Sequence, residues 1–96
     1  MVNHVVFFKW KADATAAQKK AVMDGLKGLP GKIAEIKGWK LVESIPGRPP
    51  RFYHLGWFAE FENIAAVDRY IAHADHQAVV PLIEIACESR AAFNYE

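Results

Sequence analysis

Several features that mark large classes of proteins are absent from this sequence of 96 residues. Its one cysteine, Cys87, excludes an internal disulfide and fits a reducing compartment. No apolar run approaches the roughly 20 residues that a membrane-spanning helix needs. No signal peptide precedes the first expected strand. We therefore expect a cytoplasmic protein with no membrane partner.

Recognisable sites for several ligands are also lacking. Twelve Lys and Arg residues nearly balance eleven Asp and Glu, and no basic patch is interleaved with aromatic residues, so we expect no nucleic-acid partner. No glycine-rich turn between a strand and a helix is available for flavin or nicotinamide, and we expect no cofactor. His73 and His76 form a His-x-x-His pair, but no carboxylate or thiol is placed to complete a zinc site, so we expect no metal.

Apolar residues, in contrast, are abundant. Hydrophobic residues make up 52% of the chain and aromatic residues 12%, including three tryptophans. A chain of this size buries only about 60–65% of the surface that its unfolded form exposes. Surplus apolar surface on a small domain is often buried against another chain. We expect one domain over residues 1–96 that forms a homodimer.

The residue pattern predicts alternating strands and helices. Strands are expected over residues 2–10, 39–45, 52–61 and 88–95. A first helix is expected behind a capping box formed by Thr15 and Gln18, and a second behind Asn63. Pro81 suits the first turn of a short helix over 82–86. This β-α-β-β-α-β order predicts a ferredoxin-like α+β domain with an antiparallel four-stranded sheet and helices on one face.

The other face of that sheet is also expected to be apolar. Alternation along the first and third strands places Val5, Phe7 and Phe58 there. Two such sheets packed face to face would remove this surface from water and form a dimeric α/β barrel.

One short segment concentrates reactive side chains, in the pattern Tyr70-x-x-His73-x-x-His76. Steps of three keep the three rings within one third of a helix circumference. A break is expected at Ala74–Asp75, with Asp75 free to cap a new turn, and His76 still emerges beside Tyr70. A neutral imidazole can take a proton from a carbon acid, and a phenol can donate to the enolate oxygen that develops. The hypothesis is that His76 is a catalytic base and Tyr70 its partner donor.

The same pair also fits a structural role, in which His76 is the hydrogen-bond partner of a buried Tyr70 hydroxyl. Trp57 bears on this choice, since an indole buries on the order of 200 Å² and could fill the space that a long substrate would need. The residues that we expect to contact a substrate are His4, Val6, Phe8, Trp57, Ala59, Ile71, His73 and Val79.

Three stretches resemble the stress-responsive A/B barrel (Dabb) domain family: the opening VNHVVFFKW, the Tyr70-to-His76 motif and the closing Phe93-Asn94-Tyr95. The resemblance covers essentially the whole chain and implies a homodimer whose two four-stranded sheets form a barrel flanked by helices. Most bacterial members have no established activity.

One plant branch of the family resembles polyketide cyclases, in which a histidine and a tyrosine of this stretch promote an aldol condensation without a cofactor. That resemblance places the base on His76, the tyrosine on Tyr70 and the histidine of the first strand on His4. The chain departs from the family at Ala74, where proline is common, and this loosens the turn that aims His76.

Three functions therefore fit the sequence. The first is a cofactor-independent enzyme, of lyase or isomerase type, acting on a small carbonyl or polyketide-like compound. The second is a non-catalytic, stress-related dimer that binds a small apolar ligand. The third is a cofactor-free monooxygenase, as found in the wider dimeric barrel superfamily. An open cavity beside Tyr70 and His76 favours an enzyme, and a space filled by Trp57 and Phe8 favours the second function.

Overall fold

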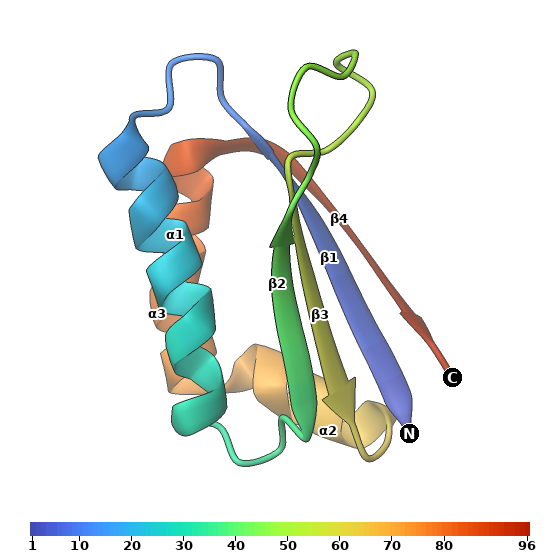
Figure 1. The fold of residues 1–96 in the computed structure, drawn as a ribbon. Helices are drawn as coiled ribbons and strands as arrows, with labels where there is room; N and C mark the ends of the chain where they lie inside the picture. The colour runs from blue at the N-terminus through green and yellow to red at the C-terminus, as the bar shows by residue number, and fades with distance from the viewer.

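The computed structural model describes residues 1–96 and contains one antiparallel sheet covered on one face by helices (Figure 1). The strands lie in the order β2-β3-β1-β4. They are β1 (Val2–Trp10), β2 (Gly38–Glu43), β3 (Leu55–Phe61) and β4 (Cys87–Tyr95), and the helices are α1 (Ala16–Gly28), the 3-10 turn η1 (Leu29–Gly31), α2 (Ile64–Ala72) and α3 (Ala74–Ala86). The predicted ferredoxin-like α+β fold is confirmed. No helix combines the length and the apolar character that crossing a membrane would require.

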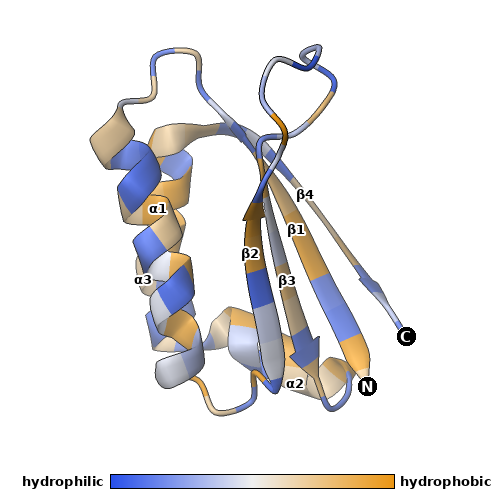
Figure 2. Ribbon diagram, in the orientation of Figure 1, coloured by the Kyte–Doolittle hydropathy of each residue, from blue (hydrophilic) through white to orange (hydrophobic).

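The first helix begins where its capping box predicts. The Gln18 backbone N–H donates to Thr15 Oγ1 over 3.1 Å, and the Thr15 N–H donates to Gln18 Oε1 over 2.9 Å. Behind this cap Val22 and Leu26 are buried against the sheet, and bands of opposite hydropathy alternate along α1 (Figure 2). The apolar stripe continues through η1 to Leu29, which is also buried.

The two strands that flank the proline-rich segment are shorter than expected. β2 ends at Glu43 rather than residue 45, and β3 begins at Leu55 rather than residue 52. Pro46, Pro49 and Pro50 have no N–H to give to a ladder, so the chain leaves the sheet and forms the long loop that projects beyond it (Figure 1).

The expected short helix over 82–86 is wrong, because α3 runs without interruption from Ala74 to Ala86 through Pro81. Pro81 is exposed, whereas Val79 and Ile83 are buried. A Cβ on Gly25 would lie 3.3 Å from Val79 Cγ1, so the missing side chain allows α1 and α3 to pack closely. This burial outweighs the one helical hydrogen bond that proline removes.

The break between α2 and α3 falls at His73, and the cap is a different residue from the one expected. His73 has φ −64° and ψ 138°, an extended conformation between two helices. Its Nδ1 accepts the backbone N–H of Asp75 over 3.1 Å, so His73 caps α3 and Asp75 occupies the first turn. The helix dipole stabilises a carboxylate in the first turn as well as at the cap, so the preference for Asp near a helix start does not distinguish these two positions for Asp75.

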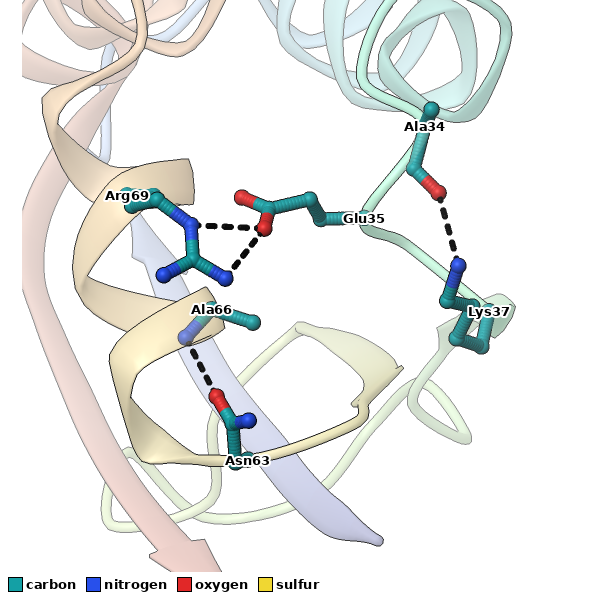
Figure 3. Close-up of polar contacts among 6 residues, drawn as sticks. All are labelled: Ala34, Glu35, Lys37, Asn63, Ala66 and Arg69. Carbon is teal, nitrogen blue, oxygen red and sulfur yellow. Dashed lines mark hydrogen bonds and ion pairs between the residues drawn. The ribbon is translucent and has the colours of Figure 1, made fainter.

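Helix α2 is held at both ends by polar contacts, drawn in Figure 3. Asn63 Oδ1 accepts the Ala66 N–H over 2.9 Å, which confirms the expected cap. Near the other end, Arg69 Nε and Nη2 approach Glu35 Oε1 at 2.7 and 2.5 Å. The guanidinium holds the pKa of the Glu35 carboxyl below its ordinary value through this hydrogen bond. These contacts orient α2 so that Tyr70 faces the sheet.

The sheet face turned away from the helices is apolar, as expected. Val5, Phe7 and Phe58 lie on it, and Val5 is already buried between its strand partners Phe58 and Phe93. Phe93 and Tyr95 on β4 remain 54% and 49% exposed. A single chain therefore leaves aromatic surface uncovered on this face.

Candidate functional site

A cavity of about 360 Å³ lies between the sheet and the helices. Every strand except β2 contributes to its walls, and so does each of the three α-helices. The lining residues are His4, Val6, Phe8, Leu26, Trp57, Tyr70, Ile71, His76, Val80, Ile83, Arg90 and Ala92.

Tyr70 is a buried polar group of this cavity, with 1% of its surface exposed. The indole Nε1–H of Trp57 donates to its hydroxyl oxygen over 3.1 Å. Burial raises the pKa of Tyr70 to about 12, against the opposing effect of the Trp57 hydrogen bond. Since the indole N–H can only donate, the phenol keeps its own proton free to donate to a ligand.

His76 lies edge-on to the phenol, with ring centroids 4.6 Å apart and an angle of 61° between the planes. The hydroxyl of Tyr70 accepts from Trp57, and no hydrogen bond joins it to His76. His76 Nδ1 is buried and has no hydrogen-bond partner. An unsatisfied buried nitrogen is costly in a native structure, and a ligand is one way to satisfy it.

The protonation of His76 is set chiefly by its burial. Desolvation lowers the pKa of the imidazole below its ordinary value, because the charged form loses more hydration than the neutral form. The Ile71 carbonyl opposes this effect, and the positive charge of Arg90 adds to it, as does that of His4 when its ring is protonated. His76 is therefore neutral at pH 7, with a nitrogen lone pair that can accept a proton.

A second imidazole, that of His4, also packs edge-on to the phenol. His4 is 6% exposed, and its ring centroid is 5.8 Å from that of Tyr70. His4 Nδ1 is 2.6 Å from Asn94 Oδ1. An amide oxygen only accepts, so Nδ1 carries the proton and Nε2 of the neutral ring is left as an acceptor. The tautomer of His4 is thus set by a residue 90 positions away.

Most of the residues predicted to contact a substrate do line the cavity, namely His4, Val6, Phe8, Trp57 and Ile71, together with Tyr70 and His76. Ala59, His73 and Val79 do not. Ala59 is buried in the core beside the cavity, His73 caps α3, and Val79 packs against α1 at Gly25. Helix α3 turns Val79 toward α1 and Val80 toward the cavity, a distinction that depends on where the helix begins.

Five lining residues were not predicted: Leu26, Val80, Ile83, Arg90 and Ala92. Val80 and Ile83 follow His76 at helical spacings of four and seven, which would have indicated them had α3 been recognised as continuous. Arg90 and Ala92 share a face of β4, and their place becomes clear only once β4 is known to pair with β1.

The indole of Trp57 does not fill the space beside the catalytic candidates. Trp57 is fully buried and Phe8 is 2% exposed, and the cavity remains open beside them. Its volume is at the low end of the range of about 300–1,000 Å³ for small-molecule pockets, so a small ligand fits better than a long one.

No three His, Cys, Asp or Glu side chains lie close enough together to hold a metal ion. His4 and His76 both reach the cavity, but His73 is engaged at the start of α3. The structure therefore does not bring the three histidines together.

Comparison with known proteins agrees with the fold and the predicted family. The family model described as "Stress Responsive A/B Barrel Domain" (Dabb) matches residues 2–96. A dimeric protein of unknown function and ferredoxin-like fold from Bacteroides fragilis is 30% identical, with a TM-score of 0.82 and coverage of 99% of this chain and 94% of that chain. A Dabb family protein from Mesorhizobium loti is 25% identical, with a TM-score of 0.79 and coverage of 99% and 94%.

A hydroxynitrile lyase from Passiflora edulis is 18% identical, with a TM-score of 0.85 and coverage of 98% of this chain and 90% of that chain. At that identity the likeness concerns the fold alone. No curated protein sequence matches the chain.

Proposed function

The chain belongs to the stress responsive A/B barrel (Dabb) domain family, and from its cavity we propose that it is a cofactor-independent enzyme, of lyase or isomerase type, acting on a small carbonyl compound. One observation carries the proposal. The half-buried imidazole of His76, whose buried Nδ1 has no hydrogen-bond partner, lies against a phenol whose oxygen accepts from Trp57 and whose proton is free.

The proposed reaction begins with proton abstraction from the carbon next to the carbonyl. A His76 nitrogen accepts the proton, and the C–H electron pair becomes the carbon–carbon double bond of an enolate. The negative charge moves to the carbonyl oxygen, where the Tyr70 hydroxyl donates a hydrogen bond. Return of the proton to a different atom completes an isomerisation, and loss of a leaving group completes an elimination. Neither route consumes an oxidant or a reductant.

The properties of the two groups suit these roles. Burial keeps His76 neutral at pH 7, and it raises the pKa of Tyr70 to about 12, so the phenol is protonated and acts as a hydrogen-bond donor. Apolar walls exclude water, which strengthens a hydrogen bond to a developing oxyanion. The P. edulis lyase shares only the fold, so the proposal depends on His76 and Tyr70 and not on that enzyme.

We extend the proposal to a homodimer joined through the outer faces of the two sheets. The relative from B. fragilis is described as dimeric. The exposed rings of Phe93 and Tyr95 supply apolar surface for such an interface, which should bury more than about 1,000 Å². The single cysteine, Cys87, is buried and unpaired, which suits a reducing cytoplasm, and we place the protein there.

A second candidate function is the binding of a small apolar ligand without chemistry. Nine of the twelve residues that line the cavity are hydrophobic, which favours an apolar ligand whether or not a reaction follows. This candidate requires a ligand in the cavity but no role for the His76 lone pair.

Exchange of α-protons for deuterium separates the two candidates. Acetophenone and 2-hexanone would be incubated with the protein in D₂O, and loss of the α-proton signal followed by NMR. We expect the wild-type protein to accelerate exchange, His76→Gln to lower the rate by about 10²–10⁴-fold, and Tyr70→Phe by about 10²–10³-fold. His54→Gln is the matched control, because His54 is an exposed histidine outside the cavity.

Two results would contradict the enzyme. One is exchange no faster than in free imidazole at the same concentration. The other is a rate that His76→Gln leaves unchanged. Binding of either ketone without exchange would support the second candidate.

A further inference from the structure

Arg90 is the one permanently charged residue among those that line the cavity. It stands opposite Phe8 in the pairing of β4 with β1, and so it belongs to the sheet face that the helices cover. β4 is an edge strand, and Arg90 is exposed, whereas Tyr70 is 1% exposed. The cavity thus has a cation at its open side and the phenol at its buried side.

This guanidinium has no partner within the chain. The ion pairs of the protein join Lys20 with Asp24 and Arg69 with Glu35, and neither includes Arg90.

The side chain of Arg90 makes no hydrogen bond either. Glu84 and Glu88 line a shallow depression that also includes Arg90, but neither carboxylate forms an ion pair with it. The five donors of the guanidinium remain available.

The charge of Arg90 nevertheless reaches the reactive group. It contributes to the lowered pKa of His76, together with burial and the charge of His4. No Asp or Glu lines the cavity, and Glu84 and Glu88 belong to the neighbouring depression, so within the cavity Arg90 is the charge that an anion would meet.

We propose that the substrate is a small carbonyl compound that also carries a carboxylate, and that Arg90 is the specificity-determining residue that binds this carboxylate. The inference builds on the proposed function and adds the substrate class. The planar fork of a guanidinium matches two carboxylate oxygens at once. The apolar body of the molecule would contact Val6 and Ala92, while its carbonyl reaches the buried end beside Tyr70.

Binding of the carboxylate would also act on the base. A bound anion offsets the charge of Arg90 at His76, so the pKa of His76 rises and its lone pair becomes more basic when the substrate is present. The groups that face His76 are the ring of Tyr70, the Ile71 carbonyl, and the charges of His4 and Arg90. Of these, Arg90 is the group that the ligand would neutralise.

A matched pair of probes tests the inference by binding alone. Hexanoate and hexanamide share one apolar chain and differ in the charged group. Each would be titrated into the protein at low ionic strength, with dissociation constants taken from NMR shifts of Val6 and Ala92. We expect hexanoate to bind at least about ten-fold more tightly than hexanamide, with a preference that shrinks as salt is added.

Variants assign the preference to one side chain. Arg90→Gln should remove it, and Arg90→Lys should retain part of it, since an ammonium keeps the charge and loses the fork. Arg48→Gln is the control, because Arg48 is an exposed arginine of the β2–β3 loop that stacks on Phe52. Hexanoate, but not hexanamide, should raise the titration midpoint of His76.

Equal affinities for the two probes, a preference that survives in Arg90→Gln, or failure of hexanoate to bind would each overturn the inference. The same titrations in the His76→Gln variant, which lacks the proposed base, test the Arg90 site independently of the enzyme hypothesis. A carboxylate preference in a protein that exchanges the α-protons of neither the neutral ketones nor a keto carboxylate such as 5-oxohexanoate would refute the proposed enzyme and retain the Arg90 site. Exchange of neutral ketones without a carboxylate preference would retain the proposed enzyme and refute the Arg90 site.

Discussion

The indole N–H of Trp57 donates a hydrogen bond to the hydroxyl of Tyr70 over 3.1 Å, inside the core of the domain. The indole of Trp57, which lines the cavity, is therefore also a hydrogen-bond donor. It occupies an acceptor site of the phenol and leaves the phenolic proton free, while His76 Nδ1 has no hydrogen-bond partner. The proposed donor and the proposed base are therefore both available to a ligand.

The first prediction concerns this hydrogen bond. Trp57→Phe removes the donor and part of the buried volume, so we expect the free energy of unfolding to fall by about 2–4 kcal/mol, of which about 1 kcal/mol reflects the hydrogen bond. Trp39→Phe is the control, since Trp39 packs on Trp57 but is 44% exposed. Urea unfolding measures both, and equal losses in the two variants would count against the buried bond.

The second prediction concerns the effect of pH on stability. Burial lowers the folded-state pKa of His76 below its ordinary value of 6.5. As the pH falls, the unfolded chain therefore binds this proton at a higher pH than the folded protein does. The contribution of neutral His76 to the free energy of unfolding is lost as the pH falls from about 6.5 through the folded-state pKa, and it is unchanged above that window. His76→Gln should lose less stability than wild type between about pH 7 and about pH 5. Parallel pH profiles, or a His76 that titrates in NMR like a model peptide, would refute the lowered pKa.

The third prediction tests the proposed dimer. Phe93 is 54% exposed on the outer sheet face, so Phe93→Asp should leave the fold intact and yield a monomer, because it would bury an unpaired carboxylate in the interface. Ile85→Asp changes a residue that is 53% exposed on α3, and it should stay dimeric. Sedimentation at micromolar concentration distinguishes the two. A wild-type monomer, or a Phe93→Asp variant that sediments as a dimer, would exclude this interface.

The fourth prediction concerns the amide that orients His4. Asn94→Ala leaves His4 Nδ1 buried without a partner, which should cost about 1–3 kcal/mol of unfolding free energy. Asn3→Ala is the control, because Asn3, which pairs with Tyr95 of β4, lies on the face of the sheet opposite to His4. A loss in Asn94→Ala no greater than in Asn3→Ala would show that the contact does not hold the ring.

Much of the fold was predictable from neighbouring residues. Alternation along residues 2–10 identified β1 with its observed ends, and Thr15 and Asn63 marked the starts of two helices. These signals are local, since a cap or a strand face depends on residues a few positions apart. The interruption expected at Pro81 was local reasoning as well. It was wrong because burial of Val79 and Ile83 against the rest of the domain outweighs one missing helical hydrogen bond.

The sequence by itself determined the strand and helix order, and it placed Tyr70 and His76 in one short segment, six positions apart. Their contact does not follow from the spacing within one helix, because the break at His73 puts Tyr70 on α2 and His76 on α3. Only the tertiary structure decided what surrounds them. Trp57 meets Tyr70 across 13 positions and Asn94 meets His4 across 90. Arg90 reaches the cavity because β4 pairs with β1. Such contacts depend on which strands become neighbours and on how the helices pack over them, and that is settled by the burial of the whole core.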